Sequence, residues 1–468
     1  MLDIEAAASP RSPAPTFRDG AGDVGRAFVE AVTEAIEAAD KSRVFALVED
    51  LHEADLGDLI EALQPDDRPR LIELLGTEFD FTALTEVDDA VREDILEELE
   101  TETVAEGVRE LDADDAVAIL EDLDPEDAHE ILERLPPTER VALRRALDYP
   151  EASAGRRMQT ELIAAPLFWT VGQAIDFMRE TEDLPETFYE IFVVDPGHRL
   201  LGAVPLDKLL RAKRPVPLGD VMRDDDHRVR ATDDQADAAR LFQRYNLVSA
   251  AVTDEGGRLV GVLMVDDIVD VLDEEADADL KQLGGVKPEE EISDNVADIA
   301  RSRFPWLFAN SITAVVSASV IRLFEGSVEQ MVALAVLMPI VASMGGNAGT
   351  QTMTVTVRAL ATRQLGRANT WRIVRREVVV GLINGVIFGL LIGVVAAVWF
   401  GITDLGVVIG LALLAVLFVA AFGGILIPLL LNRLGVDPAV SSGPFVTTTT
   451  DIVGFFAFLG IATLWFRL

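Results

Sequence analysis

Cysteine is absent from this chain of 468 residues, and histidine occurs only 4 times. The absence of cysteine excludes disulfides, thiolate metal sites and cysteine nucleophiles. The histidines are scattered, and the sequence has no phosphate-binding loop, no phosphorylated-aspartate motif of an ion pump and no candidate catalytic triad. We therefore expect a protein that is not an enzyme.

A secretory signal is also missing from the sequence. The first 20 residues contain Pro10, Pro13 and Pro15 and have no apolar core, which is unlike a signal peptide. Residues 1–23 are instead predicted to form a disordered leader.

Positive charge is scarce over most of the chain, which has 80 acidic and 40 basic residues, only 5 of them lysine. Residues 301–468 hold 6 of the acids and 11 of the bases and carry +5, which leaves −45 on the first 300 residues. Such a field repels nucleic acid and attracts cations, so we expect no nucleic-acid partner. Both a divalent-ion sensor and a salt-adapted, halophile-like surface fit this charge. The scarcity of lysine favours the second for most of the acids.

Residues 24–149 have apolar residues at helical spacing, with proline or paired acids at the expected helix starts. Within them, residues 51–67 match residues 111–127 at a constant shift of 60. Stacked helix pairs of this kind form a small superhelix. A docking scaffold and a sensing domain both remain open for this α-helical region.

Residues 150–273 contain two copies of one α/β pattern. Residues 192–210 align with residues 251–269 at a shift of 59. Each copy has a strand, an Asp/Gly turn, a second strand that ends in Gly-x-x-x-x-Asp, and then a helix. The pattern predicts two tandem modules, at 150–215 and 216–273.

Residues 301–468 are predicted to form an all-α membrane domain. A spanning helix needs ~20 mostly apolar residues. A polar helix and linker at 274–300 lead into this domain and are placed to transmit a signal. Five segments are long and apolar enough: 304–324, 331–357, 378–400, 406–431 and 445–466.

Arginine placement predicts the orientation of these segments, because cytoplasmic loops are enriched in basic residues. The loop between the second and third segments is therefore expected in the cytoplasm, together with the N-terminal domains, and Leu468 is expected outside. The arginines of this loop are Arg363, Arg367, Arg372, Arg375 and Arg376.

The second segment contains a proline and several polar residues. Pro339 removes a helical hydrogen bond, and Gly345 and Gly346 permit deformation of the backbone. Irregular backbone at this depth is tolerated where it lines a water-filled path, so a broken helix is expected here. Close helix packing through small residues is the alternative, but Asn347 and Gln351 favour a pore.

The last segment carries Asp451, a carboxylate at membrane depth. Such an acid is costly unless it faces water, a cation or a protein partner. A run of hydroxyls, Thr447 to Thr450, precedes it, and oxygen ligands suit a hard, hydrated cation. Asp437 is expected either at the mouth of the same path or as a helix-capping acid. The remaining candidate pore-lining residues are Gly345, Gly346, Gln351, Thr447 and Thr450.

The two α/β copies resemble the cystathionine-β-synthase (CBS) domain, whose tandem pairs often bind adenosine nucleotides. ATP is therefore a candidate ligand, although no motif here requires it. Over residues 24–466, the domain order and three motifs, Gly345–Gln351, Gly435–Ala439 and Thr450–Gly454, resemble the MgtE family of magnesium transporters, also described as channels. The resemblance implies a homodimer in the lipid bilayer of the plasma membrane, with one pore on its two-fold axis.

In this family the acid that matches Asp451 binds the permeating Mg²⁺, and Asp437 and Asn347 lie in the matching motifs. The resemblance also implies that cytosolic Mg²⁺ binds between the N domains, the CBS domains and a plug helix at 274–300 and holds the pore shut. The matching acids are Asp114, Asp234, Asp267, Asp270, Glu275 and Asp279.

Some positions where the family pattern offers a metal ligand depart from it, which leaves the strength of this feedback open. They are Thr82, Ala118, Gln243, Asn246 and Ala278. The alternative function is a membrane-anchored receptor that senses nucleotide or ions through its CBS pair without transport. The motifs in the second and fifth segments argue against it.

Overall fold

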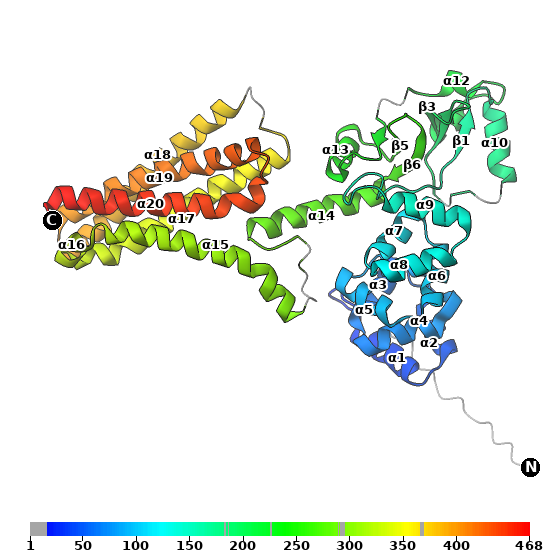
Figure 1. Cartoon of the computed structure of the whole chain (residues 1–468), viewed down its shortest axis with the longest axis horizontal. Coiled ribbons are helices and arrows are strands. Elements are labelled where there is room, and N and C mark those ends of the chain that lie inside the picture. Colours follow the sequence, from blue (N-terminus) through cyan, green and yellow to red (C-terminus); the bar gives the residue numbers. More distant parts are fainter. Residues whose placement is uncertain are drawn as a thin grey trace, which may run out of the picture. The chain divides into compact units, whose positions relative to one another are not determined.

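The computed structural model describes residues 16–181, 184–185, 187–224, 227–288, 290, 295–365 and 369–468. Most of the predicted leader and Arg367 lie outside these ranges. The chain divides into two compact units, Met1–Glu275 and Ala276–Leu468. Figure 1 shows the helices and strands of both units along the chain.

The first part of the first unit consists of short helices whose apolar faces share one core, in which Leu59, Ile60 and Leu71 are fully buried. The repeat predicted from the sequence is visible, because the helices that begin at Glu53 and Ala113 start 60 residues apart. The α-helices are α1 (Arg26–Glu37), α2 (Lys41–Val48), α3 (Glu53–Ala62), α4 (Arg68–Leu75), α5 (Asp89–Glu98), α6 (Thr101–Glu110), α7 (Ala113–Glu121), α8 (Pro125–Arg134) and α9 (Pro137–Leu147). Short 3-10 helices lie between them at η1 (Pro65–Asp67), η2 (Gly76–Glu78) and η3 (Phe81–Leu84).

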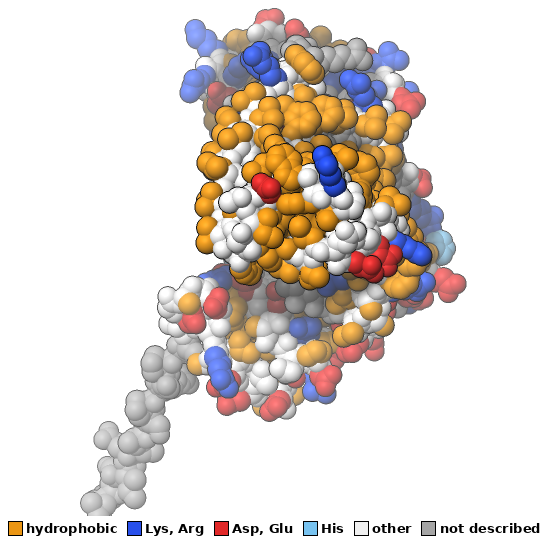
Figure 2. All heavy atoms as spheres, turned by 90° about the vertical axis from the view of Figure 1, so that its left-hand side faces the viewer, with side chains coloured by type: hydrophobic (Ala, Val, Ile, Leu, Met, Phe, Trp, Pro, Cys, Tyr) orange, Lys and Arg blue, Asp and Glu red, His pale blue; other side chains and the backbone are white. Residues whose placement is uncertain are grey.

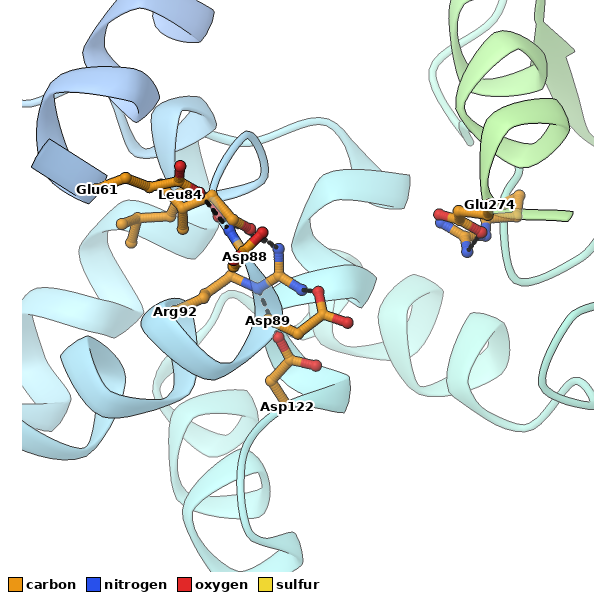
Figure 3. A network of polar contacts seen from close by, with 9 residues as sticks. Glu61, Leu84, Asp88, Asp89, Arg92, Asp122 and Glu274 are labelled. Atoms are coloured by element: carbon orange, nitrogen blue, oxygen red, sulfur yellow. Dashed lines mark hydrogen bonds and ion pairs between the residues drawn. The ribbon is translucent and has the colours of Figure 1, made fainter. Parts of the chain in front are cut away.

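A buried arginine ties these helices together (Figure 3). The side chain of Arg92 on α5 is only 8% exposed. Its Nε donates to Asp122 Oδ2, at the end of α7, at 2.5 Å, and its Nη2 donates to Asp89 Oδ1 at 2.6 Å. Its Nη1 donates to the carbonyl oxygen of Leu84 at 3.3 Å. One side chain therefore satisfies acceptors from three elements, η3, α5 and α7.

Replacing Arg92 with alanine should destabilise this region by about 3 kcal/mol, because it leaves a partly buried carboxylate and a buried carbonyl without donors. Native-state hydrogen exchange of the α5 and α7 amides in the full-length chain measures this loss. Arg26→Ala is the matched control, since the Arg26–Glu30 pair is exposed and should contribute only about 0–0.5 kcal/mol. Equal exchange in the two variants would show that the Arg92 network does not stabilise the fold.

The second part of the first unit contains two small mixed sheets of the same topology. In the first, β2 (Glu190–Val194) pairs in parallel with β1 (Ala164–Pro166) and antiparallel with β3 (Leu200–Pro205). In the second, β5 (Ser249–Thr253) pairs in parallel with β4 (Val229–Arg230) and antiparallel with β6 (Leu259–Met264). The other elements are α10 (Val171–Glu180), α11 (Leu206–Arg211), α12 (Leu218–Val221) and α13 (Gln235–Tyr245).

The two modules interlock through their hairpin turns. The amide of Leu200 donates to the carbonyl oxygen of Gly257 at 3.1 Å, and the amide of Leu259 donates to that of His198 at 2.9 Å. Leu200 and Leu259 are 59 residues apart, the shift found in the sequence. Each sheet also has its register irregularity at the matching place, after Val193 in one and after Val252 in the other. The tandem α/β pair predicted from the sequence is therefore confirmed.

Among the described residues of the second unit, five helices are long and apolar enough to cross a membrane, as the sequence predicts. The long helix α14 (Val265–Leu283) enters this unit from the first, and the short helix α16 (Glu325–Gln330) follows the first candidate span. The five candidate spans are α15 (Val296–Arg322), α17 (Val332–Ala361), α18 (Thr370–Phe400), α19 (Thr403–Arg433) and α20 (Pro438–Phe466).

Helix α19 is the centre of this unit, because α17, α18 and α20 all pack against it. Glycines allow α18 and α19 to approach closely. A Cβ added at Gly389 would lie 2.7 Å from the carbonyl oxygen of Gly410, and one at Gly393 would lie 2.7 Å from that of Gly406. Such small-residue contacts are typical of helix pairs in bilayers. Figure 2 views this unit from the end that carries the C-terminus and shows many hydrophobic side chains there.

Candidate functional site

Helix α17 carries a polar surface on one side and a packing surface on the other. Ser343, Asn347 and Gln351 follow one another at intervals of four residues and are exposed, so they share a face of the helix. The Nδ2 atom of Asn347 donates to Ser343 Oγ at 3.5 Å. Gly345 and Gly349, on the other side, are buried.

The expected break in this helix is not observed, because α17 runs from Val332 to Ala361 without interruption. A Cβ at Gly345 would lie 2.5 Å from Val416 Cγ1, and one at Gly349 would lie 2.8 Å from Val446 Cγ1. Close packing against α19 and α20 therefore accounts for these glycines. Gly346 has no atom within 4 Å of an added Cβ and faces away from this contact.

Asp451 lies on α20 and is half-buried. Thr447, one turn earlier, is exposed, whereas Thr450 is only 1% exposed and packs near Gly345 and Gly349. The hydroxyl of Thr450 donates to the carbonyl oxygen of Thr447 at 2.9 Å. Within a single chain, Gly345 and Thr450 thus serve helix packing, while Gly346, Gln351, Thr447 and Asp451 remain accessible from outside the helix bundle.

Asp437 is exposed and begins α20 as its N-cap. Its Oδ1 accepts the backbone N–H of Ala439 at 2.8 Å. This is the capping role that was one of the two alternatives for Asp437, and it leaves the second carboxylate oxygen available to water or an ion.

The end of α14 packs against the membrane helices of the second unit. Leu283 joins a small apolar cluster with Val357 of α17 and Val446 of α20. Asp279, a predicted sensor acid, pairs with Arg358 of α17 at 3.2 Å. An arginine on the same chain therefore already neutralises this carboxylate.

A glycine turn follows α14. Gly285 has φ +77° and lies against the ring of Trp306, where a Cβ would overlap the indole. Trp306 also approaches Gly443 of α20, with ring atoms 3.6 Å from an added Cβ. One tryptophan therefore contacts both the turn after α14 and the start of the helix that carries Asp451.

In the first unit, two predicted sensor acids meet: Asp114, in the first turn of α7, and Asp267, in the first turn of α14, form a side-chain contact. Gln159 Nε2 donates to Asp114 Oδ2 at 3.2 Å, and the amide of Met264 donates to Asp267 Oδ2 at 3.3 Å. Asp114 Oδ1 is buried and receives no hydrogen bond. Burial raises the pKa of the Asp114 carboxyl, and burial followed by the adjacent Asp114 raises that of Asp267.

This pair fits a divalent cation. An unpaired buried carboxylate oxygen beside a second carboxylate is costly unless a proton or a cation compensates it. Oxygen-only donors suit Mg²⁺, which keeps several waters and needs only one or two carboxylates from the protein. Among the described residues no group of three or more acidic, histidine or cysteine side chains could hold a metal, so water or a second chain would complete the coordination.

Two neighbours of the pair, Asp115 and Gln159, were not predicted as site residues. Burial, and then the charges of Asp114 and Asp112, raise the pKa of Asp115 to about 7. Gln159 contributes its amide from the segment before the first sheet. In the sequence, the acidic residues at 112–115 look like an ordinary helix start. Only their burial in the structure distinguishes them from other acidic helix starts.

Of the other predicted sensor acids, Asp270 follows Asp267 by one turn of α14, and Asp234 and Glu275 have hydrogen bonds of their own. Asp234 is the N-cap of α13 and accepts the amides of Ala236 and Asp237. Glu275 Oε1 accepts from Gln235 Nε2 at 3.4 Å. Burial is the main cause that raises the pKa of Asp270.

Comparisons with protein families match three parts of the chain. A divalent cation transporter family, MgtE, matches residues 338–461; the MgtE intracellular N domain matches residues 51–152; and the CBS domain matches residues 218–274. The first includes the accessible polar residues of α17 and α20, and the second includes Asp114.

Among curated proteins, the chain is similar to "Magnesium transporter MgtE" of Enterococcus faecalis, at 36% identity over 69% of this chain and 72% of that protein. The protein of that name from Thermus thermophilus is 37% identical over 68% and 70% of the two chains. Among solved structures, the cytosolic domain of the Mg²⁺ channel MgtE in complex with ATP is 29% identical and covers 52% of this chain and 99% of its own, with a TM-score of 0.48.

Proposed function

This chain belongs to the MgtE family of magnesium transporters, and from this premise we propose that it is a Mg²⁺-selective channel or transporter that takes up Mg²⁺ across the plasma membrane. It is a multi-pass membrane protein with cytoplasmic N domains. The observation that carries the proposal is the accessible polar surface of α17 and α20, with Asn347, Gln351, Thr447 and Asp451 exposed or half-buried on long apolar helices.

A single copy does not enclose this surface, so we propose that two copies face one another across it as a homodimer. Two Asp451 carboxylates would then flank one path. Mg²⁺ dehydrates reluctantly, and carboxylates that contact it through its waters would select it without stripping it. Such contacts also release the ion, which conduction requires. The exposed Asp437 is placed to attract Mg²⁺ at the cytoplasmic mouth, and the C-terminus is outside.

We propose further that cytosolic Mg²⁺ closes the pore by binding at Asp114 and Asp267. These residues join α7 to the beginning of α14, whose other end packs on α17 and α20 through Leu283. A cation that binds only one arrangement of α7 and α14 shifts the equilibrium toward that arrangement. Asp234, Asp270, Glu275 and Asp279 would contribute to further weak sites, where Arg358 competes with Mg²⁺ for Asp279. ATP at the CBS pair stays a prediction.

The test is Mg²⁺ flux into liposomes that contain the full-length chain with its N domains inside, over a range of Mg²⁺ concentrations on that side and at fixed membrane potential. We expect flux at low Mg²⁺ that falls as Mg²⁺ on the N-domain side rises into the millimolar range, about the affinity of a site with few carboxylates. Absence of flux at every concentration would refute transport. Flux that never falls would refute the regulatory part alone.

A further inference from the structure

The first two turns of α18 form a cationic surface that neither the pore nor the sensor uses. Trp371 is 75% exposed. Arg372 and Arg375 are exposed, and their guanidinium groups make no ion pair or hydrogen bond within the described part of the chain, whereas Arg376 pairs with Glu377 at 2.9 Å. These residues follow the loop after α17, which is cytoplasmic because the N domains are cytoplasmic and α15 and α17 each cross the bilayer.

The two unpaired arginines lie at the end of an apolar stripe. Arg372, Arg375, Val379, Ile383 and Val386 succeed one another at intervals of three or four residues and therefore share one face of the helix. The three apolar side chains are 45%, 54% and 59% exposed. The face changes from cationic to apolar within one turn, as a helix does where it passes from lipid headgroups into hydrocarbon.

We propose that Arg372 and Arg375, with Trp371, bind the headgroup of an anionic phospholipid in the cytoplasmic leaflet. An arginine guanidinium forms paired hydrogen bonds with phosphate oxygens, and tryptophan favours the headgroup level. The positive end of the α18 dipole adds to the attraction. Clusters of arginine beside a membrane helix are suited to anionic lipids.

The apolar stripe favours a lipid over an acidic segment of protein. An acidic segment would satisfy the two guanidinium groups but would leave Val379 and Ile383 uncovered, whereas one phospholipid covers both parts with its headgroup and chains. The first 300 residues carry −45, so an acidic segment among them is the competing ligand of the two arginines. The experiment must distinguish this ligand from a phospholipid.

The test uses native mass spectrometry of the full-length chain in detergent, titrated with phosphatidylglycerol or phosphatidylcholine. We expect preferential binding of phosphatidylglycerol, about 5-fold weaker for Arg372→Gln and about 30-fold weaker for Arg372→Gln with Arg375→Gln, from typical gains per basic residue at an anionic surface. The double lysine variant keeps the charge and should retain most of the binding. Arg322→Gln is the matched control, because Arg322 is an exposed arginine at the opposite end of a spanning helix and should not alter binding.

Equal affinity of wild type and the double glutamine variant for phosphatidylglycerol would overturn the proposal. Displacement of the lipid by inorganic phosphate would also overturn it, because the arginines would then be a site for free anions. A full-length wild-type chain with no preference for phosphatidylglycerol would assign the arginines to the acidic domains instead. Unchanged thermal unfolding of the double variant separates these outcomes from misfolding, and binding is measured independently of Mg²⁺ flux.

Discussion

Replacing Asp451 with asparagine should reduce Mg²⁺ flux by about 100-fold. The proposed homodimer would lose two carboxylates at once, and a loss of about 1.4 kcal/mol of ion stabilisation at each is a factor of 10 apiece. Asparagine keeps the shape and one carbonyl oxygen, so the packing of α20 should survive. The measurement is Mg²⁺ entry into liposomes, reported by a Mg²⁺-sensitive dye at fixed membrane potential and low Mg²⁺ on the N-domain side.

Asp437→Asn is the matched control for this loss. Asp437 caps α20 through its bond to the amide of Ala439, and asparagine caps helices as well as aspartate does. The helix should therefore begin unchanged, and flux should fall by less than about 10-fold, since an exposed charge contributes about 1 kcal/mol or less. If the Asp451→Asn variant conducts as much Mg²⁺ as the Asp437→Asn variant, Asp451 does not bind the permeating ion.

The double variant Asp114→Asn, Asp267→Asn should conduct at Mg²⁺ concentrations that close the wild type. Asparagine preserves a neutral hydrogen-bonding side chain at each position but removes the charge that favours a divalent ion. We expect half-inhibition to shift upward by at least about 10-fold, which corresponds to about 1.4 kcal/mol of lost binding. Basal flux at low Mg²⁺ should be unchanged, because neither residue lies in the second unit.

The same variant should be more stable than the wild type when no metal is present. The folded-state pKa values of Asp114 and Asp267 lie above the ordinary value of 3.8, so the folded protein holds these protons more tightly than the unfolded chain. In the metal-free wild type, these two carboxyls should therefore contribute most to stability below about pH 3.8. Their contribution should be lost as the pH rises toward their raised folded-state pKa values. The variant should lack this loss, and added Mg²⁺ should stabilise the wild type more than the variant.

Thermal unfolding of the first unit within the full-length chain, between pH 5 and 8 with a chelator, measures this difference. Glu126→Gln removes one exposed charge from α8 in the same unit and is the control for net charge. Inhibition by Mg²⁺ that persists in the double variant would remove the pair from the sensor. A variant with the wild-type dependence of stability on pH would show that the two carboxylates are not coupled by burial.

The fold was largely predictable because its signals are local. Helical periodicity, the 60-residue shift between Glu53 and Ala113, and the 59-residue shift between Leu200 and Leu259 each follow from patterns within short windows. The five long apolar segments required only length and composition. The family resemblance itself rested on short motifs in α17 and α20.

The site was less predictable, because its properties depend on contacts between distant segments. The expected break at Pro339 and Gly345 follows a local rule, but α17 is a continuous helix that packs against Val416. The raised pKa of Asp115 and the partnership of Asp279 with Arg358 arise from burial and proximity. The sequence alone reveals neither the burial of a side chain nor its distant neighbours. Capping acids and buried acids therefore cannot be told apart from the sequence.

The glycine contact between α18 and α19 also bears on how this protein is made. Only Gly401 and Ile402 separate the two 31-residue helices, so the ribosome delivers both to the translocon almost together. We expect them to leave it as one hairpin, because Gly389 and Gly393 already fit the backbone of α19. A larger side chain at either glycine should then appear first as failed insertion and degradation of nascent chains, before any defect in a finished transporter can be measured.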